Sequence, residues 1–154
     1  MAKLQIRKVG DEALRKTCRP VDAITPRVLT LLDDMLETMR AANGCGLAAP
    51  QVGILRRIVV IEVEPGEVIE LINPKIIAFS GEQDGQEGCL SVPGQWGMVK
   101  RPMNVTVRAL NRLGEEIEIT GHELLARCFC HELDHLDGTL YIDKASSMND
   151  EDDE

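Results

Sequence analysis

The pattern that most constrains this chain is His131-Glu132-Leu133-Asp134-His135, near the C-terminal end of the sequence. Residues four positions apart on an α-helix project from the same face, about one turn apart, so both imidazoles can bind one metal ion. Glu132 can then take a proton from a water molecule at that metal. The alternative is a chance pattern on a solvated helix face, because short motifs have false matches. The pattern predicts a helix that carries a hydrolytic metal site.

Patterning elsewhere predicts two helices and several short strands. Thr25 suits the cap of a helix and Pro26 its first position, and apolar residues at helical spacing predict a helix to about Ala42. A capping box of Thr120 and Glu123 predicts a second helix over 121–135, which carries the motif. Strands are predicted at 57–63, 68–72 and 75–79, a polar loop at 81–88, and a hairpin at 105–110 and 116–119.

These elements predict an α+β fold. Mostly antiparallel sheets should pack around the C-terminal helix that carries the motif, with a second amphipathic helix near the N-terminus. The length of 154 residues suits one domain, which we expect to be a catalytic domain over 1–145. Residues 146–154 are predicted to form an acidic, disordered tail, because the chain ends in five consecutive acids.

Charge and apolar patterning exclude several classes of protein. The net charge is −9, and the last five residues carry five of these charges, so no broad nucleic-acid-binding face is expected. The N-terminus lacks a secretory apolar region and no apolar run has the length of a membrane span, which predicts a cytoplasmic protein. The five cysteines are an odd number, and in a reducing compartment they are expected to be free thiols.

Two histidines do not complete a catalytic site of this kind, which usually takes three protein ligands and a water molecule. One extended motif places a third histidine shortly after a glycine, but Tyr141 stands at that position here. Few residues follow His135, and their glutamates lie in the acidic tail. We therefore expect the third ligand to come from upstream of the motif.

Four cysteines and one histidine are the upstream candidates to be weighed. His122 lies more than two helical turns before the first motif histidine, too far along the axis to share its metal ion. Cys128 and Cys130 are close to that histidine in sequence but off its face, and free cysteines commonly pack in cores. Cys45 and Cys89 remain, and both stand beside glycines that let the backbone approach a ligand closely.

Three motifs in this chain resemble those of peptide deformylases of the bacterial type. Gly44-Cys45-Gly46-Leu47-Ala48-Ala49-Pro50-Gln51 resembles the family's GxGLAAPQ motif. Glu87-Gly88-Cys89-Leu90-Ser91 resembles EGCLS, and the histidine motif resembles HExDH. The three occur in the family's order and at similar spacing, and the resemblance extends to about Lys144. Together they are far more specific than any one of them alone.

The resemblance implies a metal site formed by Cys89, His131 and His135, and so selects Cys89 over Cys45 as the third ligand. It also implies one divalent metal ion, Fe(II) in the cell, with zinc, nickel or cobalt as substitutes. A thiolate and two imidazoles suit several of these metals, so the sequence does not choose among them.

The implied reaction is hydrolysis of the N-formyl group from the initiator methionine of newly synthesised proteins, which releases formate. By resemblance, Glu132 is the general base, and it later returns the proton to the leaving amine. The side-chain amide of Gln51 and the backbone N–H of Leu90 are implied to stabilise the oxyanion of the tetrahedral intermediate.

The resemblance further implies a substrate-binding pocket. Glu87 is implied to orient neighbouring groups, and the residues implied to bind substrate are Gly44, Cys45, Gly46, Glu87, Gly88, Leu124 and Cys128. Arg127 replaces the apolar residue usual at its position, and Trp96 falls in a variable part of the rim. These two departures put the shape of the pocket in question, but not the chemistry.

The implied partners are N-formylmethionyl peptides and nascent chains, without a membrane and without direct contact to nucleic acid. A contact with the ribosome is open, but not through the acidic tail, which ribosomal RNA would repel. Two alternatives remain: an HExxH metallopeptidase that cuts internal peptide bonds, and an inactive metal-binding protein of the same fold.

Overall fold

The computed structural model describes residues 3–150, and these form two helices, three short 3-10 turns and eight strands. The bounds are η1 Glu12–Arg15, α1 Pro26–Ala41, β1 Gly46–Ala48, η2 Ala49–Val52, β2 Ile58–Ile61, β3 Ile69–Ser80, β4 Gln83–Cys89, β5 Val92–Arg101, β6 Asn104–Leu110, β7 Glu116–His122, α2 Leu124–His135, η3 Tyr141–Asp143 and β8 Ser147–Asp150.

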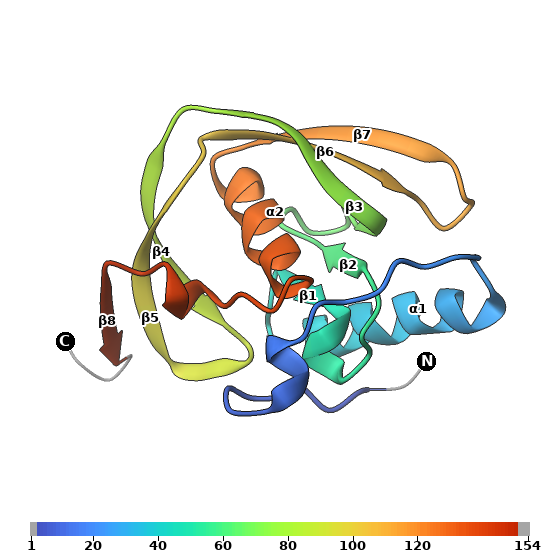
Figure 1. Cartoon of the computed structure of the whole chain (residues 1–154), viewed down its shortest axis with the longest axis horizontal. Helices are drawn as coiled ribbons and strands as arrows, with labels where there is room; N and C mark the ends of the chain where they lie inside the picture. Colours follow the sequence, from blue (N-terminus) through green and yellow to red (C-terminus); the bar gives the residue numbers. More distant parts are fainter. Residues whose placement is uncertain (1–2, 151–154) are drawn as a thin grey trace.

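The named strands form two antiparallel sheets. One has five strands in the order β1-β2-β3-β6-β7, and the other has three in the order β4-β5-β8. Figure 1 shows α2 at the centre of the molecule, between the two sheets. This arrangement confirms the predicted α+β fold, in which antiparallel sheets surround the C-terminal helix and a second helix lies nearer the N-terminus.

The two helices pack on opposite faces of β2, because side chains alternate along a strand. Val59 and Ile61 are in the apolar cluster that contains Phe129 of α2. Ile58 and Val60 belong instead to the cluster that contains Met35 of α1. The strand is therefore buried on both faces, which explains why its sequence is continuously apolar.

Helix α1 confirms the prediction made from its cap and its spacing. The Thr25 side chain accepts a hydrogen bond from the Val28 N–H at 3.4 Å, and Pro26 occupies the first turn. The predicted start of α2 is wrong. Gly121 and His122 extend β7 by pairing with Val105 and Asn104, so the helix begins only after Glu123, which has a φ of 54°.

The strand predictions are confirmed in part. The hairpin of β6 and β7 lies where it was predicted, and the two strands predicted at 68–72 and 75–79 are one strand, β3, with a shift in register near Asn73. The loop predicted at 81–88 is wrong, because most of this segment is β4 and pairs with β5. Gly85 is needed there, since a Cβ would lie 2.6 Å from the guanidinium of Arg127.

The C-terminal end also differs from the prediction. Residues 147–150 of the predicted disordered tail form β8, which pairs with β5 through positions such as Met98 and Ser147. Backbone pairing with an edge strand does not depend on apolar side chains, so composition gave no sign of it. Residues 151–154, which hold the remaining acids of the tail, lie outside the described residues.

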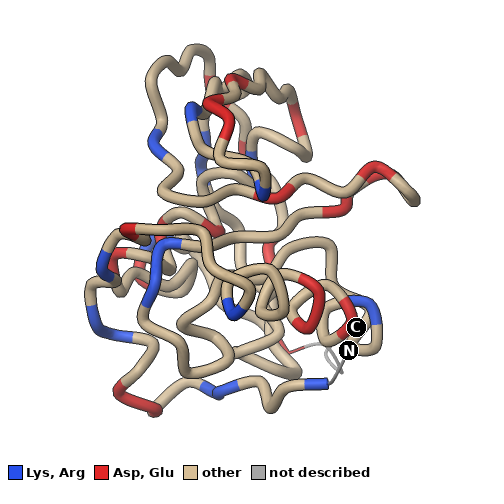
Figure 2. The backbone as a smooth tube through the Cα atoms, turned by 90° about the vertical axis from the view of Figure 1, so that its right-hand side faces the viewer, with Lys and Arg blue, Asp and Glu red and all other residues tan. Residues whose placement is uncertain are grey.

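Charges of both signs are interspersed along the chain, as Figure 2 shows. Several pair across neighbouring strands, for example Arg108 of β6 with Glu118 of β7 at 2.8 Å. In the described residues, neither helix combines the length and apolar content that a bilayer span requires.

Candidate active site

The fold brings Cys89, His131 and His135 together. Their potential ligand atoms all lie within 4.8 Å of one another, and Cys89 Sγ is 3.4 Å from His135 Nε2. The two histidines are one turn apart on α2, as the motif predicted. Cys89 is the last residue of β4, and the two residues after it form the tight turn into β5. The Cys89 thiol therefore lies at the tip of this hairpin, next to α2.

Glu87 fixes the orientation of the first motif histidine. Its Oε1 lies 2.9 Å from His131 Nδ1, which leaves Nε2 of the imidazole to face the cluster. The His131 ring is also stacked on Tyr141, with centroids 5.8 Å apart and 23° between the planes. A carboxylate on the remote nitrogen of a ligand histidine fixes its tautomer and raises its basicity, and metal sites use this arrangement widely.

The Glu87 carboxylate is itself buried and held by two arginines. Arg101 donates to both of its oxygens at 2.9 Å, and Arg127 donates to Oε2 at 2.5 Å. Burial alone would raise the pKa of Glu87, but the hydrogen bonds from Arg101 and His131 outweigh it and lower the pKa to about 2. The carboxylate is therefore a permanent anion beneath the histidine.

The contact with Glu87 gives Arg127 a structural role, although the sequence alone had suggested that this residue alters the shape of the pocket. Its charge is turned toward Glu87 and the Val99 carbonyl, which accepts from Nη1 at 2.9 Å, and the side chain is buried. The Arg127 guanidinium is therefore paired with Glu87, although its Nη2 has no hydrogen-bond partner among residues 3–150. Trp96 pairs with Asn149 in the ladder between β5 and β8 and is not among the residues that line the active-site cavity described below.

Gln51 points its amide nitrogen at the cluster. Its Oε1 accepts from the Ala48 N–H at 2.9 Å, which settles which end of the amide faces the sulfur. Nε2 donates to Ser91 Oγ at 3.1 Å and lies 3.5 Å from Cys89 Sγ. A distance of 3.5 Å is normal for an N–H···S hydrogen bond, so both amide protons have acceptors, and sulfur is the weaker of the two.

Glu132 lies directly beside the cluster, with Oε2 4.0 Å from His131 Nε2. Its Oε1 is buried and has no hydrogen-bond partner among residues 3–150, an arrangement that a water molecule could satisfy. Burial raises the pKa of Glu132 to about 7, against the opposing effect of His131. Gly46 makes room for this carboxylate, since a Cβ there would lie 2.5 Å from Oε2.

These groups open into one cavity of about 320 Å³. Its lining includes every residue predicted to act in the site except His135, namely Gly44, Cys45, Gly46, Gln51, Glu87, Gly88, Cys89, Leu90, Leu124, Cys128, His131 and Glu132, together with Asn43, Gln86 and Arg127. Cys45 does not join the metal cluster; its Sγ lies 3.6 Å from that of Cys128.

Sequence reasoning missed Arg101 and Ser91. Arg101 holds Glu87 and also donates to Asp134 at 2.8 Å, and Ser91 holds Gln51. Ser91 belongs to the EGCLS motif, so the motif itself was a usable signal. Arg101 lies 14 residues from its partner Glu87, and no local pattern marks it.

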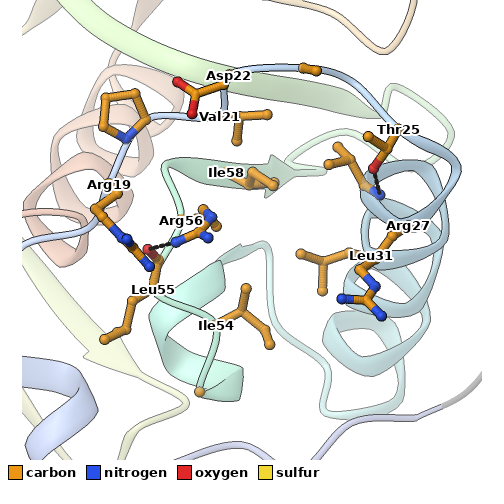
Figure 3. A pocket seen from close by; sticks show the side chains of 14 residues that line it. Arg19, Val21, Asp22, Thr25, Arg27, Leu31, Ile54, Leu55, Arg56 and Ile58 are labelled. Carbon is orange, nitrogen blue, oxygen red and sulfur yellow. Dashed lines mark hydrogen bonds between the residues drawn. The ribbon is translucent and has the colours of Figure 1, made fainter.

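A larger hollow, of about 810 Å³, lies elsewhere, between α1 and the loop before β2. Figure 3 shows apolar side chains that line it, such as Leu31, Ile54 and Ile58, together with arginines such as Arg19 and Arg56. Its lining contains no histidine, cysteine or glutamate, so the smaller cavity is the one equipped for hydrolysis.

A family model described as polypeptide deformylase matches residues 3–151. The chain belongs to this family. A peptide deformylase of Agathobacter rectalis is 60% identical over 144 residues, which cover 94% of this chain and 90% of that protein. One of Acetivibrio thermocellus is 60% identical over 152 residues, covering 99% and 89%.

Solved deformylase structures share the fold. The crystal structure of a peptide deformylase from Legionella pneumophila has a TM-score of 0.91 at 45% identity and covers 94% of this chain and 86% of that one. One from Synechococcus elongatus, solved with actinonin, has the same score at 40% identity and covers 94% and 79%. This deformylase is thus an enzyme that removes the N-formyl group from newly synthesised peptides.

Proposed function

We propose that this deformylase hydrolyses the formyl amide of N-formylmethionyl peptides with Cys89, His131 and His135 as metal ligands and Glu132 as general base. The observation that carries the proposal is that a hairpin tip and one helix bring three potential ligand atoms within 4.8 Å of one another, with Glu132 beside them at the cavity. These three side chains would hold the ion, and catalytic sites of this kind use three protein ligands and a water molecule.

The donor set fits a divalent metal ion. One thiolate and two imidazoles suit iron, zinc, nickel and cobalt, and we propose Fe(II) as the ion in the cell with the others as substitutes. An ion held there supplies Lewis-acid activation of a water molecule and of the formyl oxygen. Metal analysis of protein purified without oxygen tests its identity.

Glu132 moves the proton. The carboxylate is buried beside the ligand cluster, and burial raises its pKa, so it can accept a proton from the attacking water and then release it. The same group delivers that proton to the amine as the C–N bond breaks, so formate and a free N-terminus leave. The overall step consumes one water molecule and leaves Glu132 unchanged.

Gln51 and Leu90 are suited to the oxyanion. The Gln51 N–H that donates to Cys89 Sγ lies beside the ligand set. Leu90 directly follows Cys89 in the turn between β4 and β5, and it lines the same cavity. Its backbone N–H is therefore the donor next in sequence to the proposed cysteine ligand. Preorganised donors of this kind are typically worth about 10²–10³ in turnover each.

The peptide substrate should add to the edge of the larger sheet. Among residues 3–150, strand β1, which begins at Gly46, pairs only with β2 and is the last strand of that sheet. An extended peptide can hydrogen-bond to such an edge while a side chain enters a neighbouring pocket. We assign that pocket, for the methionine side chain, to the walls formed by Cys45, Leu124 and Cys128, with Gly44, Glu87 and Gly88 completing the binding surface.

We infer that the enzyme meets nascent chains in the cytoplasm, where formylated methionine is incorporated. The acidic C-terminal end is not proposed as a ribosome contact, because its charge opposes that of RNA.

Substrate discrimination tests the proposal. The enzyme should release formate from a formyl-Met tripeptide and leave both the acetyl-Met analogue and casein intact. Cleavage of casein at internal bonds would instead favour a metallopeptidase.

A further inference from the structure

Two cysteines are in contact at the wall of the active-site cavity. Cys45 precedes β1 and is exposed, whereas Cys128 is on α2 and only 6% exposed, and their sulfur atoms are 3.6 Å apart. Both line the cavity that contains Glu132, yet neither belongs to the proposed set of metal ligands. The catalytic proposal therefore leaves this thiol pair unused.

The pair needs little movement to become bonded. A disulfide has its sulfurs about 2.05 Å apart, so the two must approach by about 1.5 Å. Cys45 lies between Gly44 and Gly46, and the preceding Asn43 has a φ of 59°, so this wall of the cavity follows a turn rather than regular structure. A small change of side-chain and loop conformation can close the gap.

We propose that Cys45 and Cys128 are an oxidation site at which peroxide forms a reversible disulfide that closes the substrate pocket. Hydrogen peroxide first oxidises the exposed Cys45 thiolate to a sulfenic acid, and hydroxide leaves. The Cys128 thiol then attacks that sulfur, its proton leaves with the departing hydroxide as water, and the S–S bond forms. In sum, two thiols and one peroxide give one disulfide and two water molecules.

Accessibility and hydrogen bonding both favour Cys45 as the first thiol to react. A peroxide in the cavity can reach it because it is exposed. The contact with Cys128, which can donate to it, lowers the pKa of Cys45 to about 6, and the thiolate is the reactive form. Cys18 and Cys130 are buried thiols, and burial raises the pKa of each.

The disulfide would tie the wall before β1 to α2 and shift side chains that line the pocket assigned to the methionine side chain. We expect a loss of roughly tenfold or more in kcat/KM, because small changes in an apolar pocket already discriminate by such factors. The ligands Cys89, His131 and His135 are not consumed, so the metal should stay bound. This consequence for activity rests on the proposed function, but formation of the bond does not.

The test treats the zinc-loaded enzyme with a few equivalents of hydrogen peroxide. The expected result is a loss of about 2 Da for two hydrogens, a peptide that links Cys45 to Cys128, retained zinc, and lower formate release that dithiothreitol restores. Cys45→Ser and Cys128→Ser, each compared with its own untreated sample, should form no link and lose less activity. Cys18→Ser and Cys130→Ser, which change thiols away from the pair, should respond as the unmodified chain does.

Oxidation of Cys89 with release of zinc and no link between Cys45 and Cys128 would overturn the proposal. So would equal loss of activity in the Cys45→Ser variant. A link that leaves kcat/KM unchanged would overturn the closing of the pocket. If the enzyme released no formate at all, the mass and peptide measurements would still decide whether the bond forms.

Discussion

Replacing Glu87 with glutamine tests the charged cluster that holds His131. The carboxylate takes hydrogen bonds from His131, from Arg101 and from Arg127, and both arginines are almost fully buried. An amide of the same shape is neutral, and its NH₂ group would face guanidinium donors. Removing one partner from a buried ion pair typically costs about 3–5 kcal/mol, because the remaining charge is left uncompensated.

The pKa of Glu87 gives a second estimate of the same quantity. A fall from 4.5 to about 2 on folding corresponds to about 3 kcal/mol in favour of the folded state. Because the folded pKa is the lower one, this stabilisation is complete above about pH 5 and is lost as the pH falls toward 2. The two estimates agree, so Glu87→Gln should lower the free energy of unfolding at pH 7 by about 3 kcal/mol or more.

The assay is urea unfolding followed by circular dichroism, with chelator present so that metal binding does not contribute. Glu118→Gln is the matched control, since it removes a carboxylate that accepts two hydrogen bonds from Arg108 on an exposed strand pair. That change should cost only about 0–1 kcal/mol. If Glu87→Gln cost no more than the control, or if the variant lost as much stability between pH 5 and 2 as the unmodified chain, the reasoning would be refuted.

The other predictions concern the site itself. Glu132→Ala should retain metal but lose at least about 10²-fold in kcat, because it removes the base and not a ligand; loss of the metal would show that the role is wrong. Cys89→Ala should abolish binding of the native metal, measured by atomic absorption, and unchanged affinity would return Cys45 to consideration. Gln51→Leu should lower kcat by about 10²–10³ with its metal content unchanged; a normal kcat would exclude the amide from the oxyanion contact.

The sequence predicted the parts of this fold that depend on local chemistry. Helix α1 followed from the Thr25 cap and Pro26, and the β6–β7 hairpin from alternating strands around its turn. The positions of both histidines on one helix face followed from their spacing alone. In each case the determining residues are neighbours in the chain.

The predictions failed where distant pairing decides the structure. Strand β4 has polar residues and glycines, and it is a strand because β5 pairs with it. Thr120 resembles a helix cap, but the pairing of Gly121 with Val105 keeps that segment in β7. Arg127 suggested a changed pocket, and only the fold shows that its partner is Glu87, 40 residues away.

The most direct measurement of the central claim is formate release from a formyl-Met tripeptide by enzyme purified without oxygen, with bound metal determined on the same sample. The account predicts turnover that rises with metal content to one ion per chain, stops on addition of a chelator and returns when Fe(II) is restored. Turnover that continued after the metal had been removed would contradict it, and so would a chain with one bound ion and no formate release.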